Sequence, residues 1–597
     1  MKIKNIYIIA ALAGTLCACS DLFEPAVENA QSEEQVFTNA ESAIGLLGYA
    51  YAMLPFETKS ATDISTDDAV TNDLTSTNRQ MAQGKWTANN DPLSQWQARK
   101  ATIQYLNTLI KNIEVVKWSS NEHRNIMFKD HILGEAYALR ALNMYYLLRN
   151  HGGYNAAGEL LGVPIVNEPE GPGSSFDRPR DTYEACVQQI FADVDMAMEL
   201  LPLDYVDITK DQIPAKYKEM GVVDAGEYNV VFGVNLKGRI SGRIAEAIKA
   251  QTALLASSPA FVEASGITSE DAANLAANVL DRIGGVSGMD PVGHVWYMQK
   301  DAINALGSGD VPKEILWRGN KNNGTEDYAF GINQEVNNFP PTLYGSGRIN
   351  PSQNLVDAFP MANGLPITES GSGYSANDPY AGRDPRFYEY ILHNGSIYRD
   401  TEIITGSYGS DDNALNRIAT STRTGYYLRK LMRDDCNPDP SATLAQYHYP
   451  VYIRYTEIFL AYAEAANEAW GPDGKGTHGY SAYDVIKAIR QRAGVAAGGA
   501  DQYLDACRGN KDMMRELIRN ERRIELCFEN KRFWDLRRWK APLNETVKGV
   551  DITAAGGKFN YKYIDVESRN YAEHMYFGPI PETEVLRWSN LDQNAGW

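Results

Sequence analysis

The sequence predicts a mainly α fold in which a tetratricopeptide-like helical scaffold carries a large, irregular, loop-rich lobe. Three observations support this prediction. Long segments repeat apolar residues with helical spacing, small residues recur on the apolar faces, and a middle stretch rich in Gly, Asn, Pro, Asp and Ser has no such repeat. Pairs of amphipathic helices repeated along a chain are typical of helical repeats, although long loops here break any strict period of roughly 34 residues.

The first half of the chain contains the first group of predicted helices. The apolar spacing predicts helices near 41–54, 93–113, 129–149, 181–201 and 241–256. We expect Asp181 to cap the fourth helix and Pro202 to end it. Alanines at 136, 138 and 141 would let neighbouring helices approach closely.

The helical pattern then stops for nearly two hundred residues. The stretch 262–445 and an earlier loop, 57–92, combine turn-forming residues with aromatic and acidic side chains. Long irregular segments of this kind in a compact protein are usually functional or disordered, and the aromatic residues favour an ordered, functional lobe.

Helical spacing returns in the last third. Tyr455, Ile458, Phe459 and Tyr462 lie on one face of a helix over 451–470, and further helices are predicted near 481–493 and 511–529. The predicted regions are therefore a leader (1–18), an N-terminal helical repeat region (19–261), an irregular ligand-binding lobe (262–445), a C-terminal helical repeat region (446–540) and a C-terminal segment packing on the lobe (541–597).

The chain begins with the pattern of a lipoprotein signal peptide. Two lysines precede a short apolar run, which ends in Leu16-Cys17-Ala18-Cys19 and is followed by acidic residues. This ending resembles a bacterial lipobox, so we expect cleavage before Cys19 and lipidation of its thiol. An ordinary secreted protein is the alternative. The run is shorter than the roughly 20 residues that span a bilayer, so membrane contact through the lipid alone is expected.

Charge and cysteine spacing exclude several classes of function. The net charge is −19 and becomes −21 without the leader, which carries two lysines and no acid. A surface of this charge repels phosphate backbones, which argues against nucleic acid as a partner. No pair among the cysteines at 186, 436, 507 and 527 has Cys-x-x-Cys spacing, so no zinc or redox site is predicted from the cysteines. Cys186 and Cys527 are expected to be buried thiols.

A resemblance becomes specific in the last third of the chain. Residues 519–539 read RNERRIELCFENKRFWDLRRW, which resembles the signature of the SusD/RagB family of outer-membrane lipoproteins. Supporting matches, in the family's order, are RDPRF (383–387), TGYY (424–427), RYTE (454–457), IRQRAG (489–494), GPIP (578–581) and QNAGW (593–597). Ala595 stands where the family usually has proline, and Asn530 where glycine is common.

The 519–539 motif is interpreted as a structural ion network. Glu521 and Glu525 lie one helical turn apart, with arginines close by in sequence, and the proposed members are Glu521, Arg522, Glu525, Arg532 and Arg537. Paired carboxylates could instead serve a glycosidase. Neighbouring arginines would, however, hold both carboxyl pKa values down and leave no proton donor near neutral pH, so no catalytic residue is predicted.

The resemblance implies a cell-surface nutrient-binding protein and not an enzyme. Members of the family capture oligosaccharides, or in some cases peptides, on the outer face of the outer membrane. They deliver them to a TonB-dependent, SusC-like transporter. The alternatives are a surface-anchored glycoside hydrolase and a helical-repeat scaffold that only assembles envelope proteins.

Ligand contacts are expected from aromatic and polar residues of the two loop regions, because sugar rings stack on aromatic faces and their hydroxyls need polar partners. The candidates are Trp86, Asp67 and Asp73 from the first loop and Trp317, Tyr328 and Tyr344 from the second. The flanking Ile315 and Leu316 favour a packing role for Trp317. No cofactor is expected. The acidic loop from Asp63 to Asp73 could bind a structural calcium ion, but it lacks EF-hand spacing and a solvated loop is the favoured interpretation.

Overall fold

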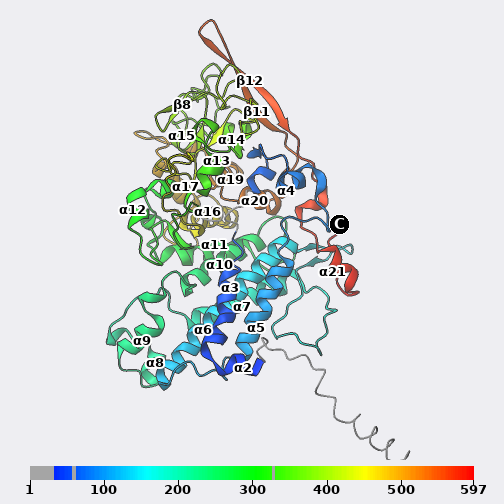
Figure 1. The fold of residues 1–597 in the computed structure, drawn as a ribbon, viewed down its shortest axis with the longest axis vertical. Helices are drawn as coiled ribbons and strands as arrows, with labels where there is room; N and C mark the ends of the chain where they lie inside the picture. Colours follow the sequence, from blue (N-terminus) through cyan, green and yellow to red (C-terminus); the bar gives the residue numbers. More distant parts are fainter. Residues whose placement is uncertain (1–32, 57–61, 326–329) are drawn as a thin grey trace, which may run out of the picture.

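The computed structural model describes residues 33–56, 62–325 and 330–597. These residues form a helical body and a lobe of short helices, loops and two-stranded sheets. In Figure 1 the lobe lies above the N-terminal helices of the body and beside its C-terminal helices. The prediction of a mainly α fold is confirmed. Cys17, Cys19 and Tyr328 lie outside the described residues.

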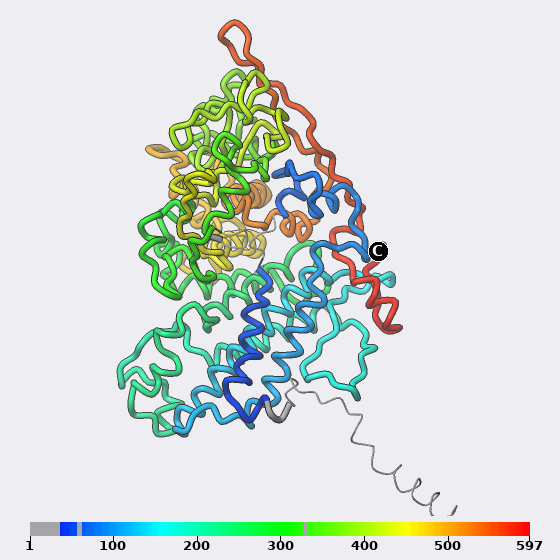
Figure 2. The backbone as a smooth tube through the Cα atoms, viewed as in Figure 1, coloured from blue at the N-terminus to red at the C-terminus, as the bar shows by residue number. Residues whose placement is uncertain are grey.

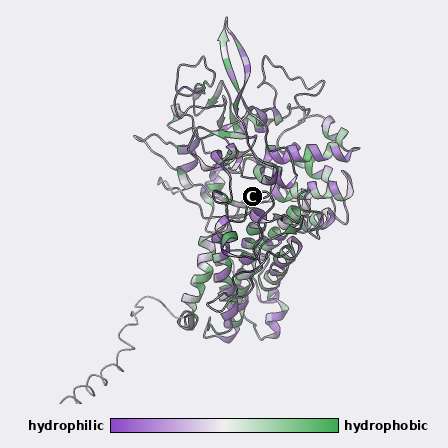
Figure 3. Cartoon of the chain, turned by 90° about the vertical axis from the view of Figure 1, so that its right-hand side faces the viewer, coloured by the Kyte–Doolittle hydropathy of each residue, from purple (hydrophilic) through white to green (hydrophobic). Residues whose placement is uncertain are grey.

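The helical body is a run of helices, each packed on its neighbours. Its members are α3 (Ala40–Ala52), α5 (Trp96–Asn112), α6 (Glu122–His151), α7 (Tyr183–Leu200), α10 (Gly242–Ala256), α11 (Ser269–Asp281), α16 (Tyr455–Trp470), α17 (Ala482–Arg492) and α19 (Lys511–Glu525). Helix α6 packs on α5 and α7, α10 on α7 and α11, and α16 on α11, α17 and α19. Helices α10 and α16 are buried on nearly all sides, as expected for helices enclosed by neighbours. In Figure 3 the helices show hydrophobic and hydrophilic patches.

Three helix starts differ from the prediction. The helix predicted over 451–470 begins at Tyr455, because the four residues before it form a strand. At the other two starts, side-chain caps and not apolar spacing decide where the helix begins. Helix α6 begins at Glu122, where the Asn121 side chain accepts a hydrogen bond from the Arg124 amide at 2.9 Å. Helix α7 is capped by Thr182 and not by Asp181. The Asp181 carboxylate instead accepts from the Ile165 amide at 2.7 Å, which ties the preceding loop to the helix.

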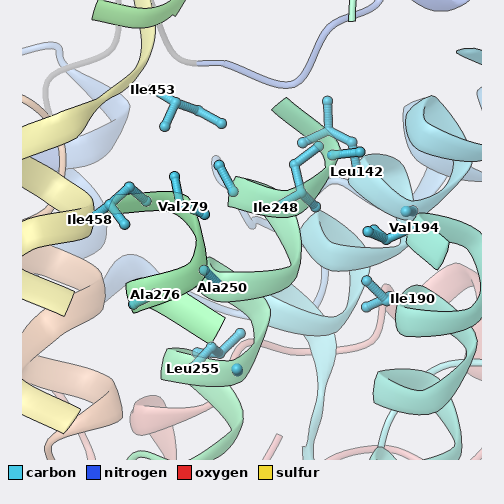
Figure 4. Close-up of a cluster of buried hydrophobic side chains, with 14 of the residues drawn as sticks. Leu142, Ile190, Val194, Ile248, Ala250, Leu255, Ala276, Val279, Ile453 and Ile458 are labelled. Atoms are coloured by element: carbon cyan, nitrogen blue, oxygen red, sulfur yellow. The ribbon is translucent and has the colours of Figure 1, made fainter. Parts of the chain in front are cut away.

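Helix α11 lies inside the stretch that was expected to be irregular. Its buried face consists mostly of alanine, at 272, 273, 276 and 277, with Val279 and Leu280. Alanine gives a weak apolar signal, yet its small side chain allows α11 to pack closely between α10 and α16. Figure 4 shows Ala276 and Val279 in the same buried cluster as Ile248 and Ile458. The helical body therefore extends past residue 262.

The lobe has its own hydrophobic core, and two antiparallel strand pairs connect it to the rest of the chain. Strand β1 (Ala69–Thr71) pairs with β5 (Ile349–Pro351), and β4 (Ile315–Arg318) pairs with β10 (Val451–Arg454). A third antiparallel pair, β6 (Ile391–Leu392) with β9 (Tyr427–Leu428), lies within the lobe. The first pair fixes the early loop on the lobe. Strand β10 runs directly into α16, so the lobe and the helical body share one continuous segment.

The remaining elements are short. In the lobe lie α12 (Lys300–Ala305), α13 (Phe330–Asn338), α14 (Gln353–Ala358), α15 (Pro385–Tyr390) and the pair β7 (Ser396–Tyr398) with β8 (Thr401–Ile403). Elsewhere lie α2 (Glu33–Thr38), α4 (Thr77–Gln80), α8 (Ala215–Glu219), α9 (Ala225–Phe232), α18 (Gln502–Cys507), α20 (Arg532–Arg538), α21 (Glu582–Arg587) and the pair β2 (Gly153–Tyr154) with β3 (Leu160–Leu161).

The C-terminal segment divides between the two parts. Strands β11 (Val547–Ala555) and β12 (Lys558–Glu567) form a hairpin that runs along the lobe to its tip (Figure 2). The chain then returns to the helical body, where Asn594 donates to the His151 carbonyl at 2.9 Å and accepts from Arg180 at 2.9 Å. The segment 541–597 was expected to pack on the lobe as a whole, but its final part packs on the helical body.

The structure also bears on the cysteines and on membrane contact. The thiols of Cys186, Cys436, Cys507 and Cys527 are free and buried. Among the described residues, no helix combines the length and apolar character needed to cross a bilayer.

Candidate functional site

A cavity of about 890 Å³ lies where the helical body, the early loop and the lobe meet. Helix α6 contributes Tyr146 and Arg149, and Phe56 follows α3. The early loop contributes Asp73 and Asn78. The lobe side is formed by α13, by Arg348 and by the segment 447–452. Segments distant in sequence thus meet around one hollow, which is a common arrangement for a binding site.

Aromatic rings form one wall of the cavity. Phe56 and Tyr452 stack with their ring centres 4.4 Å apart and their planes nearly parallel, and Tyr146 meets Phe56 edge-on at 5.8 Å. Trp317 packs edge-on against both stacked rings at 5.3 and 5.1 Å. A flat, half-exposed ring such as Tyr452 can receive the apolar face of a sugar or of another planar group.

Trp317 supports this wall and is not part of its surface. The side chain is only 1% exposed, and its indole nitrogen donates to the Gly238 carbonyl at 3.1 Å. The packing role favoured by its apolar neighbours in sequence is the one the structure shows. The tryptophan holds Tyr452 in position from behind.

Polar groups form the opposite side. Asn333, Gln334 and Asn337 of α13 are half-buried, and Arg348 pairs with Asp73 at 2.7 Å. Amides, a guanidinium and a carboxylate together offer both donors and acceptors, which is what a ligand rich in hydroxyl or peptide groups requires. Of the candidate ligand residues that the structure describes, Asp73 is the one that lines the cavity.

The cavity's described lining holds three carboxylates, and each one faces a cation. Asp73 pairs with Arg348, Glu457 pairs with Lys531 at 2.9 Å, and Glu529 pairs with Arg454 at 2.7 Å and with Lys430 at 2.6 Å. Burial opposes ionisation of Glu529, but Arg454 and Lys430 outweigh it and hold its pKa below the usual value. Hydrogen bonds from Thr75 and the charge of Arg348 likewise lower the pKa of Asp73. These two groups are therefore ionised at neutral pH and cannot act as general acids.

Trp86 does not lie in the cavity, contrary to the sequence-based expectation. Only 3% of it is exposed. Its ring packs against Phe533, Tyr571 and Trp597, and its indole nitrogen donates to Asp91 at 2.9 Å. Its polar neighbours in sequence suggested exposure, but the C-terminal segment covers it.

Asp67 is also unavailable to a ligand, because it is buried between two arginines. Arg523 donates to it at 2.8 Å and Arg532 at 3.0 Å, and Arg523 also pairs with Asp68 at 2.6 Å. The acidic loop is thus neutralised by guanidinium groups of α19 and α20, which oppose the binding of a calcium ion at these two carboxylates. Tyr344 is 57% exposed on the lobe surface, with a positive φ of 63°, and is not part of the cavity lining.

The glutamates of the 519–539 motif are buried in an ion network. Glu521 accepts from Arg386 at 2.9 Å and from Arg490 at 2.6 Å, and Glu525 accepts from Arg386 at 3.1 Å and from Arg492 at 2.6 Å. Burial would raise the pKa of each carboxyl, but the arginines outweigh it and lower both. This network joins α19 to α15 and α17.

The arginines of the same motif have other partners. Arg522 pairs with Asp535 at 2.8 Å, and Arg532 pairs with Asp67. Arg537 has no carboxylate within ion-pair distance among the described residues. Its guanidinium lies 3.4 Å from the centre of the Phe533 ring, and burial lowers its pKa to about 10. The prediction that Arg537 belongs to the ion network is therefore wrong.

The sequence analysis missed Phe56, Tyr146, Tyr452 and the amides of α13. Three tyrosines within six residues, Tyr447, Tyr449 and Tyr452, stand just before a strong helical pattern, and this clustering could have pointed to Tyr452. The α13 amides follow a polar helical pattern that many surface helices share, so nothing local marks them.

Two family models match this chain. The model of the SusD family matches residues 313–597, and a model described as "Starch-binding associating with outer membrane" matches residues 28–216. The chain is also similar to SusD-like protein P2 of Formosa agariphila, with 30% identity over 143 residues. That match covers about a quarter of each chain (24%).

Solved structures resemble the fold over nearly its whole length. A SusD-like protein of Bacteroides fragilis has a TM-score of 0.67 and 22% identity, covering 96% of this chain and 99% of its own. A SusD-like carbohydrate-binding protein of the same species has a TM-score of 0.66 and 19% identity, covering 93% and 99%. Surface glycan-binding protein A of Bacteroides fluxus has a TM-score of 0.54 and 17% identity, covering 94% and 100%. At these identities the similarity shows the fold alone.

Proposed function

This chain belongs to the SusD/RagB family, and from that premise we propose that it is a cell-surface nutrient-binding lipoprotein. It captures an oligosaccharide, or a peptide, in the cavity between the helical body and the lobe. It then delivers the ligand to a TonB-dependent, SusC-like transporter. Lipid on Cys19 holds it to the outer membrane, facing the exterior.

The cavity is the observation that carries the proposal. One wall offers the half-exposed ring of Tyr452, and the other offers the amides of Asn333 and Asn337. Sugars combine apolar C–H faces with hydroxyl groups, so they need both kinds of surface. Relatives described as carbohydrate-binding and glycan-binding support this class of ligand, as does the family description that mentions starch and the outer membrane.

The pairing of the cavity's carboxylates favours binding over hydrolysis. A glycosidase needs one carboxyl that holds a proton near neutral pH. Asp73 and Glu529 have lowered pKa values, and Glu457 faces Lys531. A pure scaffold, in turn, would have no need for a cavity with one aromatic and one polar wall.

A binding experiment tests the proposal. The purified protein is titrated with starch, fructan and mucin-type oligosaccharides and with mixed peptides, and products of hydrolysis are sought in the same samples. We expect binding of one class without cleavage. Tyr452→Ala should weaken that binding about tenfold, or about 1.4 kcal/mol, through the loss of a stacking face. Cleavage of the bound ligand would instead indicate the surface hydrolase.

Tyr344→Ala is the matched control, since it removes an exposed tyrosine of the same lobe that does not line the cavity. It should leave the affinity unchanged. A loss of affinity in this variant, with Tyr452→Ala unaffected, would move the binding site to the outer surface of the lobe. Co-purification of a TonB-dependent barrel with the protein from native outer membranes tests the proposed partner.

A further inference from the structure

Three potential metal ligands converge beside the cavity but outside its aromatic wall. Glu335 lies on α13, and Cys436 and His448 lie on the loop between β9 and β10. All three are buried, and their ligand atoms lie within 4.8 Å of one another. In sequence they are separated by about one hundred and by twelve residues, so no spacing motif reveals them.

One of the two carboxylate oxygens of Glu335 has no hydrogen-bond partner. Its Oε1 accepts from the Arg433 amide at 2.6 Å and faces His448 Nε2 at 2.9 Å. Its Oε2 is buried without a hydrogen-bond partner. A carboxylate oxygen in the interior is costly unless something compensates it, and a cation compensates it best.

His448 has the orientation of a metal-binding imidazole. Its Nδ1–H can donate a hydrogen bond to the Gln446 carbonyl at 2.9 Å, which fixes the ring and points Nε2 at Glu335. On metal binding, Nε2 would give up its hydrogen bond to Glu335 and become the ligand atom. The His448 backbone is fixed by reciprocal hydrogen bonds with Asn322 at 3.0 and 2.8 Å. The Cys436 sulfur lies 3.9 Å from the Gly331 carbonyl and also accepts from the Gln446 amide. Because the contact with Gly331 is long, coordination would displace no strong hydrogen bond that the thiol donates.

We propose that Glu335, Cys436 and His448 form a site for one Zn²⁺ ion. A thiolate, an imidazole and a carboxylate are the ligand types that zinc combines, and magnesium and calcium do not use sulfur. Bond lengths of about 2.0–2.3 Å put tetrahedral ligand atoms roughly 3.3–3.8 Å apart, so shifts of about an ångström close the site. Two anionic ligands would balance the charge of the ion.

The site joins α13 to the loop that carries one wall of the cavity, and His448 itself lines the cavity. Water from the cavity would complete the coordination. The ion would hold α13 and the loop that carries His448 in a fixed relative position. This structural role does not depend on which ligand the cavity binds.

Titration of the metal-stripped protein with Zn²⁺ alone tests the proposal. We expect one tightly bound ion per chain and a rise in the melting temperature. With Co²⁺ we expect the near-ultraviolet absorption of a thiolate–cobalt bond. Cys436→Ser should abolish that absorption and weaken Zn²⁺ binding at least about tenfold. Cys507→Ser, which removes another buried thiol, should change neither result.

Glu335→Gln serves as a second variant should Cys436→Ser fail to fold, because it keeps the size of the side chain and an acceptor oxygen. It should also bind Zn²⁺ at least about tenfold more weakly. The proposal is overturned if the parent protein binds no stoichiometric zinc, or if Cys436→Ser and Glu335→Gln both bind it as tightly as the parent.

Discussion

At the residue scale, exposure decides which aromatic side chains can touch a ligand. Trp86 and Trp317 were both candidates from sequence, and both are buried. Trp317 nevertheless contributes to the site indirectly, because it packs behind the wall formed by Tyr452 and Phe56. Trp86 belongs to a different cluster, formed with Phe533, Tyr571 and the C-terminal residues.

The first prediction concerns Trp86. Replacement by alanine removes a large buried ring and should lower the free energy of unfolding by about 3–5 kcal/mol. The affinity of the folded protein for its ligand should remain unchanged. Urea unfolding and ligand titration at low temperature measure the two quantities. Trp86→Phe is the control. It should lower the free energy of unfolding by less than Trp86→Ala does, because phenylalanine retains most of the ring contacts. Weaker ligand binding at unchanged stability would place the indole in the site after all.

At the scale of elements, buried ion pairs fix how the helices and loops are joined. Glu135 of α6 is fully buried. It accepts two hydrogen bonds from Arg239, one of them at 2.6 Å, and lies 3.1 Å from His131. Arg239 belongs to the connection that precedes α10, so the pair joins two parts of the helical body. Burial would raise the pKa of Glu135, but His131 and Arg239 outweigh it and lower the value to about 2.

The second prediction follows from this pKa. Glu135→Gln leaves the Arg239 charge without its partner and should lower the free energy of unfolding by about 3 kcal/mol at neutral pH. The folded carboxyl titrates below the unfolded one, whose pKa is about 4.3. The stabilisation by Glu135 is therefore complete above pH 4.3 and is lost as the pH falls through about 2.

Urea unfolding of the parent protein and of Glu135→Gln from pH 7 to pH 2.5 measures this effect. The difference between the two proteins should stay constant down to about pH 5 and shrink below pH 4.3. Glu114→Gln, on an exposed carboxylate that pairs with Lys129 at 2.5 Å, is the control and should show almost no difference at any pH. A difference for Glu135→Gln that grows in acid would contradict the assigned pKa direction.

At the scale of the whole molecule, the proposed lipid tether depends on the lipobox-like pattern that ends at Cys19. The acyl chains would supply the membrane affinity, at about 0.8 kcal/mol per buried CH₂.

The third prediction concerns this tether. Cys19→Ser should move the protein from the membrane fraction to the soluble fraction after cell lysis, as measured by fractionation and immunoblotting. Cys17→Ser, two residues away, is the control and should leave the protein in the membrane fraction. Retention of Cys19→Ser in the membrane would show that another contact holds the protein there.

The sequence by itself determined the mainly helical fold, most of the long helices and the family resemblance. Helical periodicity and capping are local, so they are visible in a short window of residues. Where the local signal was weak, as in the alanine face of α11, the helix was missed.

Only the tertiary structure decided the site. The cavity combines residues from the early loop, α6, α13 and the segment 447–452, which are spread along the chain between positions 73 and 452. Whether an aromatic ring lines a cavity or lies in a core depends on which distant segment covers it. Residues at the chain end cover Trp86, and the arginines at 523 and 532 neutralise Asp67. Burial and pairing of this kind are properties of long-range contacts, and no local pattern of residue types carries them.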